Sequence, residues 1–268
     1  MCKRIELKTL LINNKDSGNY YVLDGNDYFN DEEIELDIDS IDSGYLLISN
    51  IQDEKIINLN INNSHITVSL FFEKTLKNFK FNANLRQNSS LHVYAAEFSY
   101  GKVSFDSNIN LLDEKCSTDW HLASLSSNDD NKNICVSINH LSPRTTATVN
   151  NYGVCKDFSK LVFSGDSLIK KGSTGSKTVQ NAKTLVFDSH SDAICKPILK
   201  IDENDIEASH AAIVGRVNEE HMFYLTSRGL NVNQARTLIT FGYLKPILKG
   251  FLDEDIKKSI SNLIETRL

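Results

Sequence analysis

The sequence predicts a mainly β protein that ends in a small helical segment, and two observations support this prediction. Up to about residue 215 the chain is a series of short runs rich in β-branched residues, and many alternate apolar with polar side chains, as half-buried strands do. From Asn218 onward, apolar residues instead recur at helical spacing. We therefore expect a β domain over residues 1–216 and a helical domain over residues 217–268.

The strand-like runs are short, and asparagine-rich breaks lie between them at residues 62–63, 88–90 and 150–151. Asparagine tolerates the left-handed backbone conformation that tight corners demand. Hairpin signals are scarce, with Asp24-Gly25 as one candidate, and a run at residues 71–79 is also compatible with a short helix. The clearest strand runs are residues 45–49, 56–61, 65–70, 91–95, 103–105, 134–138, 146–149, 161–163, 185–187 and 197–201.

The arrangement of these strands has two candidate architectures. Many short strands without hairpin turns or intervening helices favour coils stacked in parallel, which is a β-helix. Periodicity alone leaves a β-sandwich almost as well supported. No strict repeat of six or nine residues is present, so a regular left-handed β-helix is disfavoured.

Three short helices are expected in the tail, the first over residues 220–228. The second begins with Asn231 as N-cap, with Gln234 reaching back in a capping box. It kinks or stops near Lys245, because the ring of Pro246 crowds the preceding turn. The third starts around Asp253, with acidic residues in its first turn. The expected apolar faces are Val232, Ala235, Leu238, Ile239 and Gly242 in the second helix, and Ile256, Ile260, Leu263 and Ile264 in the third.

Composition argues against several classes of protein. The net charge of -6 and the pI near 5.7 disfavour a nucleic-acid binder. No apolar run approaches the roughly 20 residues of a spanning helix, and no secretory signal follows Met1, so we expect a cytoplasmic protein without a membrane partner. The cysteines are widely spaced, which predicts reduced, mostly buried thiols. They are Cys2, Cys116, Cys135, Cys155 and Cys195.

No catalytic site can be argued from spacing. Residues 171–178 are similar to a phosphate-binding loop, but Ser176 stands where the motif needs glycine, and a strand-like run follows instead of a helix. We favour a solvated corner between coils. A polysaccharide lyase on a β-helix would need clustered acidic calcium ligands, which the strand runs lack, so a carbohydrate enzyme is only a third alternative. We expect no enzymatic activity.

Two adjacent runs at the junction of strands and helices carry a family resemblance. The first is Asp205-Ile-Glu-Ala-Ser-His-Ala-Ala-Ile-Val-Gly215, and the second is Phe223-Tyr-Leu-Thr-Ser-Arg-Gly229. Together they resemble the closing segment of the SufB/SufD family, the paired scaffold subunits of the SUF iron–sulfur cluster assembly machine. Residues 140–146 also look like the family's central segment. The resemblance implies a right-handed parallel β-helix with a small C-terminal helical domain, and it decides against the sandwich.

His210 is the residue that the resemblance singles out. In the family, the matching histidine is implicated in cluster assembly at the SufB–SufD interface, so iron or a nascent cluster at the subunit interface is implied, with no tightly bound cofactor. An imidazole could ligate iron through one nitrogen. The alternative is a histidine hydrogen-bonded within a subunit contact. Ser209 and Ala211 flank it instead of the glutamates of SufB, and residues 179–186 lack a cysteine, so the chain is SufD-like.

The second run implies a docking element for the SufC ATPase, made by Phe223, Tyr224, Arg228 and Gly229. Tyr224 and Arg228 are four residues apart and are therefore neighbours on one helix face. The alternative is a capping helix with Met222, Phe223 and Leu225 packed inward.

We therefore expect a scaffold subunit that pairs with a SufB-like subunit or with itself and docks SufC through its helical tail. Whether the pair is a heterodimer or a homodimer stays open, because a two-fold contact uses one patch for both. The alternative function is a homodimeric carrier of iron or a cluster, using His210 with Cys195 or an acid. Typical family members carry a longer N-terminal helical region, so we expect a minimal version.

Overall fold

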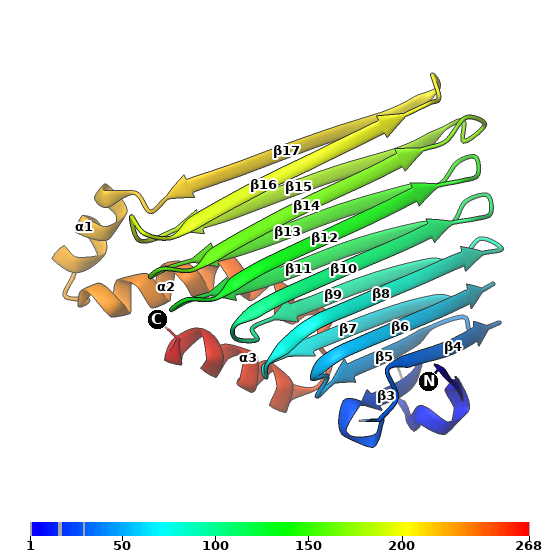
Figure 1. Ribbon diagram of the computed structural model, residues 1–268, viewed down its shortest axis with the longest axis horizontal. Helices are drawn as coiled ribbons and strands as arrows, with labels where there is room; N and C mark the ends of the chain where they lie inside the picture. Colours follow the sequence, from blue (N-terminus) through cyan, green and yellow to red (C-terminus); the bar gives the residue numbers. More distant parts are fainter. Residues whose placement is uncertain (1, 16–17, 29, 268) are drawn as a thin grey trace.

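The computed structural model describes residues 2–15, 18–28 and 30–267, and its strands form two sheets that face each other (Figure 1). Sheet A contains, in spatial order, β1 (Cys2–Glu6), β4 (Glu33–Asp39), β6 (Asp53–Asn62), β8 (Leu76–Arg86), β10 (Lys102–Leu111), β12 (Asn131–His140), β14 (Lys160–Ile169) and β16 (Asp192–Ile201). Sheet B contains β2 (Leu11–Lys15), β3 (Gly18–Asp24), β5 (Gly44–Ser49), β7 (His65–Phe72), β9 (Ser90–Glu97), β11 (Ser117–Ser126), β13 (Thr146–Cys155), β15 (Ser176–Val186) and β17 (Ile206–Arg216).

From β3 onward, successive strands alternate between the two sheets, and each pairs in parallel with the strand one coil away. Among the described residues, the strands that pair antiparallel are β2 and β3. The predicted parallel β-helix is therefore confirmed, and the sandwich is excluded because its neighbouring strands would run antiparallel. The coils lengthen along the stack, since Glu33 pairs with Ile56, 23 residues later, and Lys160 pairs with Asp192, 32 residues later.

Two of the three asparagine-rich breaks predicted from the sequence lie at corners between strands. Asn63 and Asn88 sit at corners with φ of 44° and 60°, as predicted. Residues 150–151 lie inside β13, so this predicted break is wrong. The hairpin candidate at Asp24-Gly25 forms no hairpin, because Gly25–Tyr28 is a short 3-10 turn, η2, that leads from sheet B to sheet A.

Residues 71–79 form no helix but complete β7 and open β8. Phe72, Leu76 and Phe79 are at most 1% exposed and enter the interior between the sheets. The extended backbone gives each of them a place in this core and pairs their amide groups with neighbouring strands. A local helical spacing of apolar residues was therefore overruled by tertiary packing.

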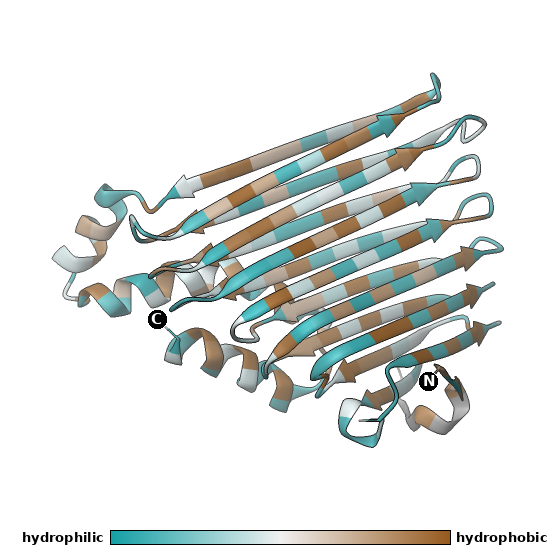
Figure 2. Cartoon of the chain, in the orientation of Figure 1, coloured by the Kyte–Doolittle hydropathy of each residue, from teal (hydrophilic) through white to brown (hydrophobic). Residues whose placement is uncertain are grey.

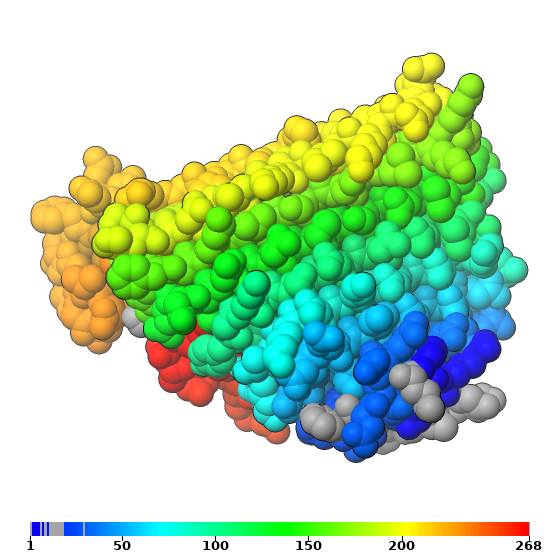
Figure 3. All heavy atoms as spheres, in the orientation of Figure 1, coloured from blue at the N-terminus to red at the C-terminus, as the bar shows by residue number. Residues whose placement is uncertain are grey.

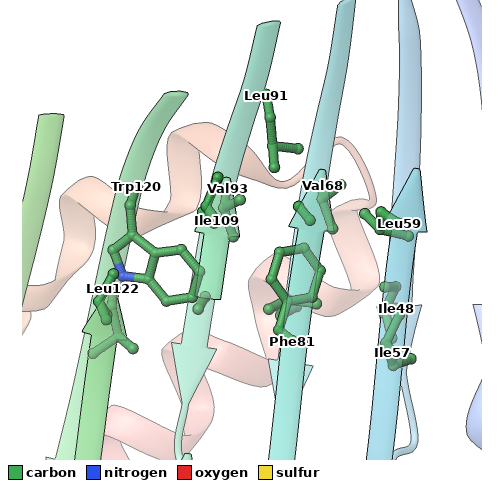
Figure 4. Close-up of a cluster of buried hydrophobic side chains, with 14 of the residues drawn as sticks. Ile48, Ile57, Leu59, Val68, Phe81, Leu91, Val93, Ile109, Trp120 and Leu122 are labelled. Carbon is green, nitrogen blue, oxygen red and sulfur yellow. The ribbon is translucent and has the colours of Figure 1, made fainter. Parts of the chain in front are cut away.

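The core lies between the sheets and runs the length of the stack. In Figure 4, Phe81 and Ile109 of sheet A lie close to Val68 and Val93 of sheet B, and each is fully buried. Alternate residues along the strands point outward, so hydrophobic and hydrophilic colours alternate along most strands in Figure 2. The alternation in the sequence thus positions one apolar face of each sheet, and burial of these faces is the main stabilising contribution.

The tail contains α1 (Glu219–Ser227), α2 (Val232–Leu244), the 3-10 helix η3 (Lys245–Gly250) and α3 (Glu254–Thr266). The capping box at Asn231 and Gln234, the helix end before Pro246 and the start of α3 around Asp253 are as predicted, and Asp253 is the N-cap of α3. Apolar residues of α2, η3 and α3 pack on the outer face of sheet B. None of the described helices is long and apolar enough to cross a membrane.

The apolar face predicted for α2 is wrong in part. Ala235 is buried, but Val232 and Leu238 are 53% and 54% exposed, while Thr240 and Leu244 are buried instead. The reason is that sheet B contacts mainly the C-terminal half of α2, whereas the predicted face is spread over the whole helix. The face predicted for α3 is confirmed, with Ile260 and Ile264 fully buried. The division into domains 1–216 and 217–268 stays a prediction.

Candidate functional site

The stack of coils has an open end. Within the described residues, β16 pairs only with β14 and β17 pairs only with β15. No residue of either strand is buried, and in Figure 3 the yellow atoms of this last coil form the upper rim of the molecule. Two long edge strands therefore leave backbone donors and acceptors free to pair with another chain.

His210 is the last member of an inward-facing row that crosses sheet B. Strand pairing places Gln180 beneath His210 and Val149 and Trp120 below that. These three residues are at most 3% exposed, so the row faces the interior. His210 itself is exposed, since no further coil covers it. Its side chain is thus positioned by the sheet to face the mouth of the open end.

Gln180 makes the floor under His210 polar. Its Nε2 donates to Ser167 Oγ at 2.6 Å and to the Ile198 carbonyl at 3.2 Å, which ties β15 to β14 and β16 across the interior. Its Oε1 is buried and has no hydrogen-bond partner among the residues that the structure describes. Gly165 makes room for this amide, since a Cβ at that position would lie 2.5 Å from Oε1. An inward glutamine in an otherwise alternating strand was the sequence signal for this change, and we missed it.

Cys195 and His210 are not brought together within one chain. Cys195 Sγ lies 3.6 Å from Thr184 Oγ1, and Thr184 pairs with Val214. His210 lies four residues before Val214 on the same strand, a separation of roughly 13 Å at about 3.3 Å per residue. Burial raises the pKa of the Cys195 thiol. No group of three or more His, Cys, Asp or Glu in the described part of the chain is placed to hold a metal ion.

Helix α1 leaves the end of β17 and projects from the body of the molecule (Figure 1). It has no buried residue, and Phe223 and Tyr224 are 74% and 57% exposed. The alternative in which Phe223 packs inward is therefore wrong. The Arg228 guanidinium lies 5.4 Å from the centre of the Tyr224 ring, so these two residues are neighbours, as their spacing predicted.

Gly229 turns the chain from α1 into α2. Its φ of 96° belongs to the left-handed region, and its N–H donates to the Thr226 carbonyl at 3.0 Å, while the N–H of Leu230 reaches the Leu225 carbonyl at 3.4 Å. These two bonds form the Schellman motif that typically ends a helix at glycine. A groove of about 650 Å³ begins just after this turn, and the sequence did not reveal it. Its lining includes Leu230, Gln234, Leu238, Phe241 and Glu265.

Residues 171–175 form a corner between β14 and β15, as favoured, and residues 176–178 begin β15. The two serines of residues 171–178 are buried and already bonded. Ser173 Oγ donates to the His140 carbonyl at 2.9 Å, and Ser176 Oγ lies 2.9 Å from Thr145 Oγ1. These hydroxyls hold neighbouring coils together and do not face an open phosphate site.

Comparison with known proteins identifies the family of this chain, and the match includes the open end and α1. A family model described as "SUF system FeS cluster assembly, SufBD core domain" matches residues 54–243, more than half of the chain, including β16, β17 and α1. The chain belongs to the SufB/SufD family. The family that the two adjacent runs resemble is therefore confirmed, and both runs lie within the matched segment.

Several curated SufB/SufD relatives match parts of this chain. The iron–sulfur cluster assembly protein SufD of Bacillus subtilis is 31% identical over 137 residues, which are 51% of this chain and 31% of that protein. SufB of the same organism is 30% identical over 110 residues, 41% of this chain and 24% of SufB. A SufBD family protein of Mycobacterium bovis is 30% identical over 129 residues, 48% of this chain and 15% of that protein. The matched segment thus spans less than a third of each relative.

Proposed function

We propose that this chain is a scaffold subunit of a SUF iron–sulfur cluster assembly complex. In this proposal the open end pairs with a second SufB/SufD-type subunit, and α1 docks a SufC-like ATPase. The observation that carries the proposal is the combination of two edge strands at the open end with an exposed histidine, His210, on the inward face of one of them, β17. The relatives named as assembly proteins support it, and we assign no catalytic step to this chain.

Pairing at the open end is supported by exposed apolar side chains on both edge strands. Ile198, Ile213 and Val214 are 44%, 52% and 47% exposed, and burial of these apolar side chains would favour pairing. A second subunit would cover them and would satisfy the free backbone groups by adding strands to both sheets. Either a SufB-like subunit or a second copy of this chain fits, and the heterodimer is the one we propose.

His210 would then be enclosed between the two subunits. Iron or a nascent cluster is the cargo of such a complex, and His210 could supply one nitrogen ligand while the second subunit supplies the others. The lack of a complete ligand set within the described residues is consistent with a shared site. The polar floor at Gln180 would lie directly behind the histidine.

A pairing experiment tests the first half of the proposal. Ala212→Arg places a long cation on the inward row next to His210, at the mouth of the open end. We expect the amount of co-purified SufB homologue to fall at least tenfold relative to wild type, because a charge would be buried in the contact. Asn133→Arg is the matched control, since Asn133 is exposed on the middle strand β12. Equal recovery of Ala212→Arg and wild type would refute pairing at this end.

A docking experiment tests the second half. Tyr224→Ala and Arg228→Ala remove the exposed neighbouring pair from α1 without touching a buried residue. Aromatic and arginine side chains are the types that most often dominate interface energy, so we expect recovery of a SufC homologue to fall about tenfold or more. Lys258→Ala on α3, which is exposed and distant in sequence, is the control. Undiminished recovery with both changes would remove α1 from the docking site.

An iron-binding experiment tests the role of His210. The pair of subunits is reconstituted anaerobically with iron and sulfide, and the visible absorbance is compared between wild type and His210→Ala. We expect a clear loss in the variant and little absorbance from the isolated chain, because this chain lacks a complete ligand set among its described residues. Equal absorbance in both pairs would show that His210 is not a ligand.

A further inference from the structure

Aspartates at one corner of the stack link neighbouring coils. Asp188 Oδ2 accepts the backbone N–H of Asp157 at 2.8 Å, and Asp157 Oδ2 accepts that of Asn128 at 2.9 Å. Asp130, at the same corner, accepts the N–H of Gly101 at 2.7 Å. Each carboxylate therefore joins its own coil to the preceding one. We call this set the corner aspartates.

Two arginines of the tail bind the corner aspartates. Arg236 of α2 donates to Asp188 Oδ1 at 2.9 Å and lies 5.3 Å from the centre of the Phe187 ring, and we call this pair the outer anchor. Arg267, at the end of α3, donates to Asp130 Oδ2 at 2.5 Å, and we call this pair the inner anchor. The tail is thus attached to the same ladder at two levels.

The two anchors differ in burial, and this decides how each can behave. Both side chains of the inner anchor are 3% exposed, and Arg267 also donates to the carbonyls of Phe98 and Ser99. Breaking such a pair leaves buried charges without partners, which is strongly unfavourable. The outer anchor is 27% and 25% exposed, so water can replace its contacts at much lower cost. The inner anchor is therefore much harder to break than the outer anchor.

The outer anchor holds the corner on which the edge strand β17 ends. Residues 187–188 follow β15 directly, and the N–H of Val217 donates to the Val186 carbonyl at 3.1 Å. Helix α1 begins two residues after Val217 and packs against α2. A displacement of α1 and the start of α2 therefore acts on the corner at residues 187–188 through two connections. One is the end of β17 at Val217, and the other is Arg236 of α2.

We propose that the Arg236–Asp188 pair is a releasable link that couples α1 to the edge strand β17. While the link is closed, the end of β17 and the start of α2 are held against the corner at Asp188. When α1 is displaced, the link opens and frees the end of β17, while the inner anchor keeps α3 in place. The role of this link in transmitting the action of an ATPase rests on the proposed function; the link itself does not.

Hydrogen exchange on the chain alone tests the link. Arg236→Gln removes the charge and keeps most of the side-chain length. We expect the amide of Val217 and those at the start of α2 to exchange roughly threefold to tenfold faster, with α3 unchanged. Arg236→Lys should restore part of the protection, and Lys258→Gln on α3 should have no effect. An unchanged Val217 rate in Arg236→Gln, or equal acceleration in α3, would overturn the proposal.

A second measurement separates the link from the docking proposal. Exchange in residues 206–217 is compared with and without nucleotide in the complex with the ATPase and the second subunit. We expect wild type to respond to nucleotide and Arg236→Gln to bind equally well but to respond at least threefold less. An equal response in both overturns the coupling. If the ATPase does not bind wild type at all, the docking proposal fails, and the measurement on the isolated chain still decides whether the link exists.

Discussion

Buried polar side chains are each held by specific neighbours. Glu97 and Lys132 are fully buried, and their Oε2 and Nζ atoms are 2.8 Å apart. Glu97 also accepts bonds from Ser99 and Ser124, and Lys132 donates to the Leu125 carbonyl at 2.9 Å. An ion pair is tolerated in an apolar interior only when its remaining donors and acceptors are bonded in this way. Some buried polar side chains keep an atom without such a hydrogen bond among the described residues, and His140 is one of these.

His140 should make the stability of the fold depend on pH. Burial lowers its pKa from 6.5 to about 4, and its Nδ1 lies 2.8 Å from Thr145 Oγ1. Its buried Nε2 has no partner within the described part of the chain. Because the unfolded chain takes up the proton first, stability is fully present above about pH 7 and is lost as the pH falls towards 4. We expect a loss of about 2 kcal/mol between about pH 7.5 and pH 5 from this group.

Urea unfolding at the two pH values measures this effect. His140→Asn, which can still bond Thr145, should be less stable than wild type at neutral pH but should lack this part of the pH dependence. His221→Asn, on the exposed helix α1, is the control and should keep it. A pH dependence in His140→Asn equal to that of wild type would contradict the prediction.

Two glycines of the tail should respond to alanine with opposite signs. A Cβ on Gly250 would lie 1.9 Å from Tyr94 Cγ, whereas one on Gly242 would meet nothing within 4 Å. We expect Gly250→Ala to lower the free energy of unfolding by about 1–3 kcal/mol through overpacking. Gly242→Ala, inside α2, should raise it by up to about 1 kcal/mol. Denaturant unfolding of both variants checks this, and equal signs would show that η3 does not rest on Tyr94.

At the scale of elements, the outer face of sheet A carries a ladder of asparagines that the sequence analysis did not recognise. The Nδ2 of each asparagine donates to the Oδ1 of its neighbour on the preceding coil, at 2.8–3.1 Å, and the first one binds Asp37. The members are Asn60, Asn84, Asn110 and Asn139. The signal was asparagine at alternate positions of successive strand runs. Sequence spacing did not show which asparagines stack, because coil length varies.

Asn84→Asp should destabilise the fold from the middle of this ladder. A carboxylate can still accept the bond from Asn110 but cannot donate to Asn60, and it places a negative charge beside that oxygen. We expect a loss of about 1–2 kcal/mol in the free energy of unfolding at neutral pH. Asn133→Asp, exposed on β12, is the matched control and should change stability by less than about 0.5 kcal/mol. Equal effects would mean that the ladder contributes nothing.

The helices of the tail show how far local sequence reaches at this scale. The N-cap at Asn231 and the start of α3 around Asp253 were predicted, because capping and a first-turn charge involve residues within one turn. The buried face of α2 was not, because it depends on which half of the helix meets sheet B. Phe223 is the same case, since its exposure follows from the direction in which α1 leaves β17.

At the scale of the whole molecule, the tail covers apolar side chains on the outer face of sheet B and leaves the open end uncovered. Leu244, Ile247 and Phe251 pack with Ile260 and Ile264 against this face. The residues of sheet B and its corners that they cover include Tyr45, Leu47, Phe71, Ala96, Phe98, Ala123, Leu125 and Val154. The tail therefore has two parts. Elements α2 to α3 complete the fold, whereas α1 contacts α2 but has no buried residue.

Shortening the chain should distinguish these two parts. A chain that ends at Val217 exposes the apolar face of sheet B and leaves Asp130 without Arg267, so we expect it to aggregate. The double variant Phe223→Ser and Tyr224→Ser should stay monodisperse with unchanged thermal unfolding, because α1 has no buried residue. Size-exclusion chromatography and circular dichroism measure both. A soluble, fully folded short chain would show that the tail does not stabilise the coils.

The sequence by itself determined the strand runs, the helix caps of the tail and, through two adjacent motifs, the family and its β-helix. These features depend on residues close together in the chain, where alternation and capping act directly. Only the tertiary structure decided that His210 faces the open end above Gln180, away from Cys195, and that Arg236 meets Asp188. Those contacts depend on the lengths of whole coils and on the packing of the tail, which no local pattern encodes.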